Sequence, residues 1–177
     1  MLSVMAILTL GSLAALLVAS VMQSARNPEQ TSASIATDHS RRGQRVIYTS
    51  RPYGFAVILP ESWKEYTVLR GAWKAIDIKT GNQEGGPSIT IRHPLWTEAI
   101  PRQDIPILVL TTAQWNKRNS FSFGAAPFGP SEMAHNAKFV FALPARYNYA
   151  FPLGYEEVDR ILRRRPFRTF EPKNTSD

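Results

Sequence analysis

The chain has 177 residues and contains no cysteine, which excludes disulfides, a lipid-modified cysteine and thiolate metal ligands. It also lacks two common catalytic motifs, the Gly-x-Ser-x-Gly nucleophile turn and a glycine-rich phosphate loop followed by lysine. Histidine is scarce, with three in the whole chain. The sequence therefore supports no catalytic residue, cofactor or metal ligand, and a binding function is the leading expectation.

Charge is missing from the first part of the chain, because residues 1–25 carry no charged side chain and are mostly apolar. A helix of this length would extend roughly 30 Å, at about 1.5 Å per residue, which matches the hydrocarbon core of a bilayer. The segment predicts a retained transmembrane anchor or a cleaved signal peptide, with Val18-Ala19-Ser20 as the cleavage site. A signal peptide normally begins with Lys or Arg, and none precedes Arg26, so we favour the anchor.

The remaining chain divides into three parts by composition. Residues 26–45 are polar and rich in Ser and Thr, which predicts a flexible linker. Residues 46–170 contain the large apolar side chains of a folded domain, and we expect residues 171–177 to be a disordered tail. The formal net charge of +7 favours an anionic partner, such as a membrane surface or an acidic envelope polymer.

Short runs of alternating or continuous apolar residues predict strands in the domain. We expect a polar loop at residues 80–87, where three glycines and a proline lie close together. A further strand is expected after Pro166. The other predicted strands are residues 46–49, 54–59, 73–78, 88–92, 105–110 and 139–143. The apolar run at 105–110 also fits a buried helix, and we prefer a strand because a helix-capping signal follows it at Thr111.

Two helices are predicted. Thr111 and Gln114 have the spacing of a capping box for a helix that starts at the next residue. Residues 155–164 place apolar side chains on one face, begin with acidic residues and end with arginines, as the helix dipole prefers. The predicted fold class is therefore α+β, an antiparallel β-sheet with two or more packed α-helices, preceded by the transmembrane helix.

Several phrases resemble a known group of proteins when they are taken together. They include Tyr53-Gly54-Phe55 leading to Leu59-Pro60-Glu61-Ser62-Trp63, then Ile91-Arg92-His93-Pro94, Asp104-Ile105-Pro106-Ile107 and Ala142-Leu143-Pro144-Ala145-Arg146-Tyr147-Asn148. The set resembles a family of uncharacterised exported or membrane-anchored bacterial proteins, many of them lipoproteins. Its opening also resembles the PsbP-like fold of the extrinsic P subunit of photosystem II. The resemblance implies a membrane-tethered domain outside the cytoplasm with an accessory role and no chemistry of its own.

The candidate binding residues combine charge with aromatic surface. They are Arg92, His93, Asp104, Arg146 and Tyr147, which we expect to line a groove for an anionic or carbohydrate-like ligand. The alternative is that the aromatic residues after Arg146 fill the core while Arg146 itself pairs with Asp104.

A second functional class is a small hydrolase or metalloenzyme. Glu132 and His135 would share one face of a helix, and addition of His93 would complete two histidines and a carboxylate around a metal. A nucleophile arrangement would instead use Ser131, with His135 as base and Asp104 as the orienting group. The simpler interpretation is structural, with Ser131 capping a helix in which Glu132 is an early residue.

Arginines between residues 160 and 168 form a basic cluster, which we interpret first as the favourable end of a helix, second as a membrane-surface contact, and last as a nucleic-acid site. Nucleic acid is therefore not an expected partner. The arginines that follow the predicted span would by themselves place the domain in the cytoplasm. The family resemblance points the other way, and we expect a single-pass protein of the cytoplasmic membrane with its domain on the outer side.

Overall fold

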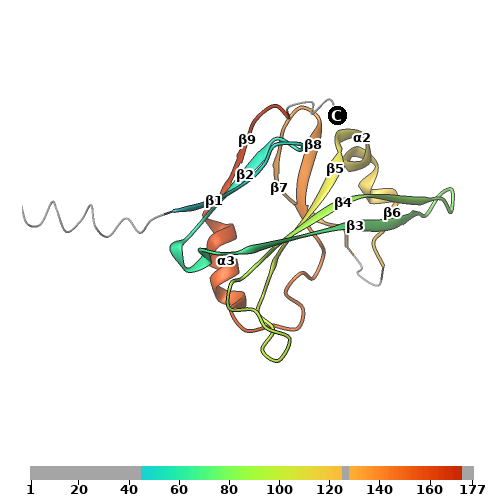
Figure 1. The fold of residues 1–177 in the computed structure, drawn as a ribbon. Coiled ribbons are helices and arrows are strands. Elements are labelled where there is room, and N and C mark those ends of the chain that lie inside the picture. Colours follow the sequence, from blue (N-terminus) through green and yellow to red (C-terminus); the bar gives the residue numbers. More distant parts are fainter. Residues whose placement is uncertain (1–44, 125–127, 173–177) are drawn as a thin grey trace, which may run out of the picture. The chain divides into compact units, whose positions relative to one another are not determined.

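A computed structural model of the chain describes residues 45–124 and 128–172. The predicted anchor at residues 1–25 and nearly all of the predicted linker lie outside the described residues, as does most of the predicted tail. Within the described part of the chain, no helix is both long and apolar enough to cross a bilayer. The described residues form one compact unit, in which two antiparallel sheets are accompanied by two short α-helices (Figure 1).

The smaller sheet has three strands in the order β1-β2-β9. The predicted strands β1 and β2 form an antiparallel hairpin, in which Val46 pairs with Leu59 and Ser50 pairs with Phe55. The predicted last strand is also present, and it pairs antiparallel with β2. The bounds of the three strands are β1 (Val46–Ser50), β2 (Phe55–Leu59) and β9 (Phe167–Thr169).

The larger sheet has six strands in the order β6-β3-β4-β5-β8-β7, and every pairing in it is antiparallel. The long pair β3 and β4 crosses the molecule in Figure 1. The bounds of the six strands are β3 (Thr67–Asp77), β4 (Gln83–Arg92), β5 (Ile105–Thr111), β6 (Phe121–Ser122), β7 (Ser131–His135) and β8 (Phe139–Leu143).

Both predicted helices are present, which confirms the α+β class with a β-rich balance. The capping box is formed, because Thr111 Oγ1 accepts from the Gln114 backbone N–H at 3.1 Å and Gln114 Oε1 accepts from the Thr111 N–H at 3.0 Å. The helical elements are α2 (Thr112–Lys117), α3 (Tyr155–Arg163) and two 3-10 turns, η1 (Glu61–Trp63) and η2 (Arg118–Ser120).

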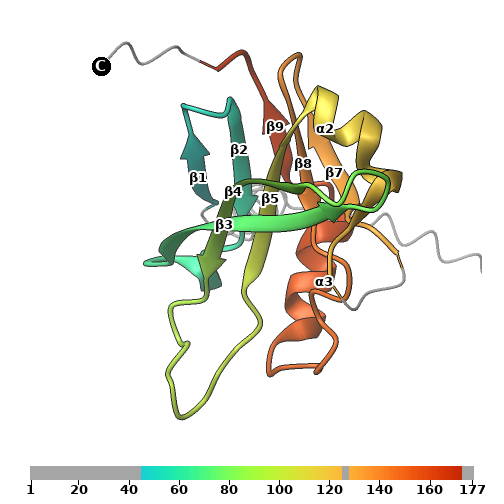
Figure 2. The ribbon, with the colours of Figure 1, turned by 90° about the vertical axis from the view of Figure 1, so that its right-hand side faces the viewer.

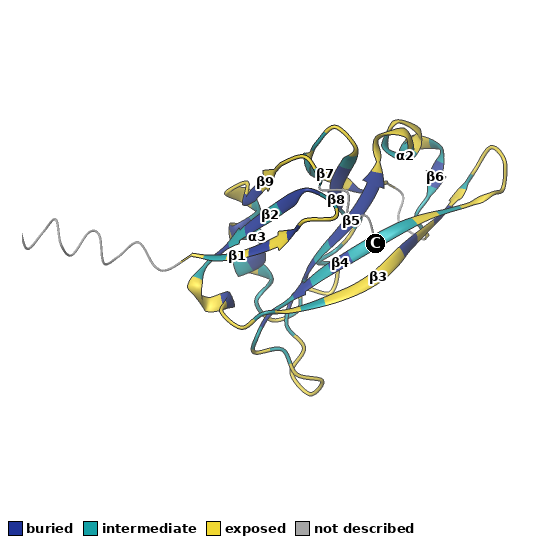
Figure 3. Cartoon of the chain, turned by 45° about the horizontal axis from the view of Figure 1, so that its top comes forward, coloured by how far each residue is buried: buried dark blue, intermediate teal, exposed yellow. Residues whose placement is uncertain are grey.

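The main core joins both sheets and α3. One cluster of buried side chains contains Phe55 from β2, Phe141 from β8 and Val158 from α3, together with Trp63 from η1. A second, smaller cluster around Trp73 occupies the other face of the larger sheet. Strand β5 contributes to both clusters, so its residues are buried on both faces (Figure 3). This explains why it reads as a continuous apolar run without alternation.

The predicted loop at residues 80–87 is wrong in its second half. Strand β4 already begins at Gln83, and Gly86 pairs with Trp73 across β3 and β4. A Cβ atom on Gly86 would lie 2.7 Å from Trp73 Nε1, so the glycine provides the space that the indole occupies. Glycine is needed here for packing inside a strand, whereas the sequence pattern suggested a turn.

The predicted helix at Ser131 and Glu132 is also wrong, because residues 131–135 form β7, an edge strand of the larger sheet. Its pairing with β8 contains a β-bulge between Glu132 and Ala134. The backbone groups of this segment are therefore satisfied by β8, and Ser131 caps no helix. Tertiary pairing overrides the local capping signal at this point.

Candidate ligand groove

A groove runs along the edge strand β7. It consists of two adjoining hollows of about 470 Å³ and 510 Å³, which share Leu143 and Tyr147. The first hollow is bounded by the chain between β8 and α3, at residues 144–151. The second is bounded by β7, by the last turn of α3 and by the start of β9. Two segments distant in sequence thus meet at one concave surface, which is the usual form of a ligand site.

Tyr147 lies at the junction of the two hollows, and its half-buried ring packs against the main core. Burial raises the pKa of its hydroxyl, and the nearby Asp159 carboxylate raises it further, while Arg163 lowers it. The phenol therefore keeps its proton at neutral pH and is available as a hydrogen-bond donor. A rigid aromatic ring with a polar tip also offers a stacking surface for a ligand.

The charges around the groove leave a positive excess. The acidic groups are occupied: Glu132 Oε1 lies 2.7 Å from His135 Nδ1, and Asp159 Oδ2 accepts from Arg163 Nε at 2.8 Å. In contrast, Arg165 takes part in no ion pair within the described residues.

Arg146 is the second groove-lining cation that takes part in no ion pair with a carboxylate of the described residues. Its guanidinium lies over the exposed ring of Tyr149, 5.2 Å from the ring centroid. Both guanidinium groups are thus open to an anionic ligand. A planar fork of N–H donors suits carboxylate and phosphate groups.

Backbone strain coincides with the groove. Arg146, Phe151 and Arg165 all have positive φ angles, of 57°, 45° and 50°, and all three line it. Such a conformation costs a residue with a side chain about 1 kcal/mol or more. At Arg165 the position directly follows the end of α3, where glycine is usual. The two positions in the β8–α3 loop have no such explanation, and strain of this kind gathers at binding sites.

No family model matches the chain, and neither a curated protein nor a solved structure is significantly similar to it. The groove is therefore interpreted from its own chemistry.

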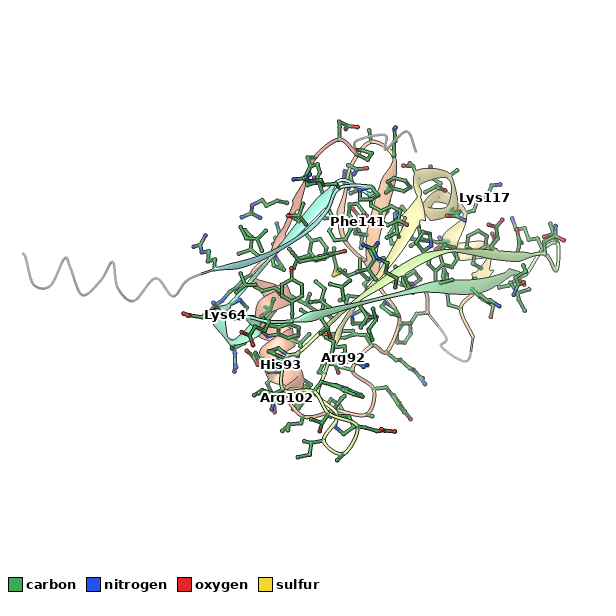
Figure 4. The ribbon with its side chains drawn as sticks, viewed as in Figure 1. Lys64, Arg92, His93, Arg102, Lys117 and Phe141 are labelled. Carbon is green, nitrogen blue, oxygen red and sulfur yellow. The ribbon has the colours of Figure 1, made fainter. Side chains whose placement is uncertain are left out.

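The structure divides the five predicted binding residues between two places. Arg146 and Tyr147 belong to the groove. The others, Arg92, His93 and Asp104, lie at the root of the loop between β4 and β5, where Figure 4 shows Arg92, His93 and Arg102 near α3. Gln103 links the two places, because its Nε2 donates to the carbonyl oxygens of Asp104 at 2.8 Å and Tyr147 at 3.2 Å.

The root of the β4–β5 loop is closed by internal contacts. Arg92 donates to Asp104 Oδ2 from Nε at 3.2 Å and from Nη2 at 3.1 Å, and its guanidinium stacks on Trp96 at 3.7 Å. The expected alternative pair of Arg146 with Asp104 is thus wrong. Of the aromatic residues that follow Arg146, Tyr147 packs against the core, whereas Tyr149 and Phe151 are exposed. Arg92 and Asp104 shape the loop and do not line the groove.

His93 is buried beside Trp63, whose ring it meets edge-on at 5.0 Å. Its Nδ1 accepts from the Leu95 backbone N–H at 3.0 Å, so the proton of the neutral ring is on Nε2, which faces Glu157 Oε2 at 3.7 Å. Burial lowers the pKa of this imidazole, and Arg102 lowers it further, against the opposite effect of Glu157 and Asp104. Neutral His93 is thus part of the structural support of the loop.

The enzyme alternatives do not assemble. Glu132 and His135 do meet, across the β-bulge of an exposed strand, but His93 is buried elsewhere against Trp63. Residues 45–124 and 128–172 contain no group of three or more side chains that could hold a metal ion. The Ser131 arrangement is not formed among the described hydrogen bonds either, because His135 is in contact with Glu132 and Asp104 accepts from Arg92.

Sequence reasoning missed the second half of the groove. The sequence analysis interprets Arg163 and Arg165 as charges at a helix end, yet both line the same hollow as Tyr147, together with Asp159. One signal was present in the sequence. Tyr147 and Tyr149 belong to no apolar run, and they lie in the short segment between Pro144 and Pro152. A loop that carries large aromatic side chains between prolines is a candidate binding loop.

Proposed function

We propose that this domain is a non-enzymatic binding module that takes an anionic ligand, such as an acidic envelope polymer, in the groove along β7. The single observation that carries the proposal is the pairing pattern of the groove: Asp159 is paired with Arg163 and Glu132 is in contact with His135, while Arg146 and Arg165 have no acidic partner among the described residues. Tyr147 between them adds a stacking surface and a hydroxyl donor.

The length of the groove favours an extended ligand. Its two hollows share only Leu143 and Tyr147, and the two free arginines belong to different hollows. A compact monoanion would reach one guanidinium, whereas a linear polyanion would place successive charges at both. We therefore expect affinity to rise with the length of the ligand and to fall with salt.

The test is binding of fluorescein-labelled linear polyphosphate by the full chain in detergent, followed by fluorescence anisotropy. The variant Arg146→Ser with Arg165→Ser should weaken binding about tenfold. The matched control, Arg51→Ser with Arg70→Ser, removes the same charge at exposed positions outside the groove and should bind almost normally. Equal weakening by both pairs would show attraction to net charge alone and would refute the groove.

The proposal also includes the location of the domain relative to the membrane. We infer a single-pass anchor at residues 1–25 that displays the domain outside the cytoplasm, in keeping with the PsbP-like resemblance and its accessory role. The uncharged N-terminal segment supports the anchor. Protease treatment of spheroplasts should degrade the domain while a cytoplasmic marker survives. Full protection until the membrane is opened would place the domain on the inner side.

A further inference from the structure

Large apolar side chains are exposed on two loops at one end of the domain. Leu95 and Ile100 lie on the β4–β5 loop, and Phe151 and Leu153 lie on the β8–α3 loop. Each is more than half exposed, at 64%, 59%, 65% and 54% respectively. Both loops extend from the lower end of the molecule in Figures 1 and 2. Four such side chains at one end need a partner that removes them from water.

The loops are ordered, so this exposure is built into the fold. The Thr97 N–H donates to the Ile100 carbonyl at 3.2 Å, and the Ile100 N–H donates to Thr97 Oγ1 at 2.9 Å, which closes the tip of the first loop. At their bases the two loops are joined, because the Gln103 N–H donates to the Leu153 carbonyl at 2.9 Å. The apolar side chains are therefore held outward from a single rigid base.

The surroundings of these side chains indicate which partner would cover them. Arg92 lies stacked on Trp96 and Arg146 on Tyr149, at the level where the loops leave the sheet. Residues 144–154 contain no acidic side chain, the β4–β5 loop carries Arg102 as well as the exposed Glu98, and the chain as a whole carries a net charge of +7. Apolar tips backed by arginines and by aromatic rings with polar edges are the features that insert into the headgroup region of an anionic bilayer.

The shape of this end favours lipid over a protein partner. Leu95, Ile100 and Leu153 protrude and line neither hollow of the groove. Protruding side chains insert between lipid headgroups without a shape-matched surface, whereas a stable protein interface needs one. The predicted anchor and linker would also keep the domain near a membrane, since a linker of about 20 residues has a mean reach of roughly 25 Å. Even a weak lipid contact would then be populated.

We propose that the tips of the β4–β5 and β8–α3 loops dock the folded domain on an anionic membrane surface, with Leu95, Ile100, Phe151 and Leu153 inserted among the headgroups. This contact is separate from the predicted N-terminal anchor and does not depend on the ligand of the groove. Phe151 also lines the groove, so docking would orient one end of the groove toward the membrane.

The absence of cysteine makes a direct test possible. The full chain is reconstituted in vesicles that contain phosphatidylglycerol, with an NBD probe on a single cysteine at Leu95→Cys or Phe151→Cys. The matched control is Thr80→Cys, an exposed residue between β3 and β4. We expect the first two probes to shift to the blue and to lose at least threefold in acrylamide quenching, while the probe at position 80 stays as accessible as free dye.

Three outcomes would overturn the proposal: equal quenching at the three positions, equal shielding in purely zwitterionic vesicles, or shielding that follows protein density, which would identify a second copy as the occupant. The double variant Ile100→Ser with Leu153→Ser, at two residues that line neither hollow, should restore quenching at position 95. Thermal unfolding of this variant verifies that its fold is intact. Polyphosphate binding by the same variant separates this result from failure of the groove.

Discussion

The indole Nε1 of Trp73 donates a buried hydrogen bond of 2.8 Å to the carbonyl oxygen of Val109. The two residues lie on β3 and β5, so the bond crosses the intervening strand β4 at Gly86. The last residue pair between β4 and β5 is Ser88 with Leu108. The carbonyl of Val109 lies just beyond this pair and accepts its hydrogen bond from the indole. The Trp73 side chain thus links β3 to β5 at a point where β4 and β5 no longer pair through their backbones.

This relationship predicts a large effect of Gly86→Ala. The added Cβ would lie 2.7 Å from Trp73 Nε1 and 3.0 Å from the Val109 oxygen, so the indole must move and leave a buried carbonyl without a donor. We expect the free energy of unfolding to fall by about 2 kcal/mol, measured by urea denaturation. Gly129→Ala is the control, because its Cβ would meet only Phe123 at 4.0 Å. Equal stability of the two variants would contradict this account.

Substitution of Asn136 is also expected to lower the stability of the fold, because the side chain of this residue connects the two sheets. Its Nδ2 donates to the carbonyls of Tyr53 at 2.8 Å and Phe170 at 3.2 Å, while its Oδ1 accepts from the Phe139 N–H at 2.9 Å. Asn136→Ala should lower the free energy of unfolding by about 2 kcal/mol.

The companion variant Asn136→Asp distinguishes these bonds from simple packing. It keeps the size and the acceptor of the side chain but turns a carboxylate oxygen toward the backbone carbonyls, so it should unfold at least as easily as the alanine variant. Thermal unfolding compares the two. An aspartate variant as stable as the unmodified chain would show that the Nδ2 bonds contribute nothing.

The lowered pKa of His93 predicts that the free energy of unfolding decreases at acidic pH. The pKa of this histidine is lowered in the folded chain, whereas an unfolded chain has the ordinary value of 6.5. Below that pH the unfolded state binds a proton that the folded state does not, so stability is complete above about pH 6.5 and declines as the pH falls toward the lowered pKa. The slope is at most about 1.4 kcal/mol per pH unit for one proton.

Urea denaturation between pH 7.5 and pH 5 measures this slope. His93→Phe should flatten it, whatever the effect of this substitution on absolute stability. A slope in His93→Phe equal to that of the unmodified chain would assign the acid response to other groups.

Removal of the arginine from each of two ion pairs is expected to lower the free energy of unfolding by very different amounts. Arg92 and Asp104 are 26% and 18% exposed, and removal of Arg92 leaves a partly buried carboxylate and an unstacked Trp96. Arg92→Ala should therefore cost about 2 kcal/mol of stability. Arg163 is 78% exposed in its pair with Asp159, and Arg163→Ala should cost less than about 0.5 kcal/mol.

The same denaturation measurement ranks both variants. Addition of Asp104→Asn to Arg92→Ala removes the unpaired charge and should recover part of the loss. Equal costs for the two single variants would mean that burial does not govern the strength of these pairs.

Local sequence determined the elements whose signals lie within a few residues. The capping box of Thr111 and Gln114 specifies the start of α2 by hydrogen bonds between its own members. The apolar run of β5 predicts a buried segment, and the capping box that follows it favours a strand over a helix. The face and charge order of α3 are likewise properties of one segment. These interactions need no distant partner, so the pattern of residues is enough to predict them.

Only the tertiary structure decided the fate of residues whose partners are far away in the chain. Gly86 lies in a strand, where the Trp73 indole and the Val109 carbonyl leave no space for a side chain. Glu132 lies in a strand because β8 pairs with it. The groove exists because Tyr147 from one loop meets the end of α3 and the edge of β7. Sequence spacing does not encode such encounters, since they depend on how the sheets pack and on which edge is left open.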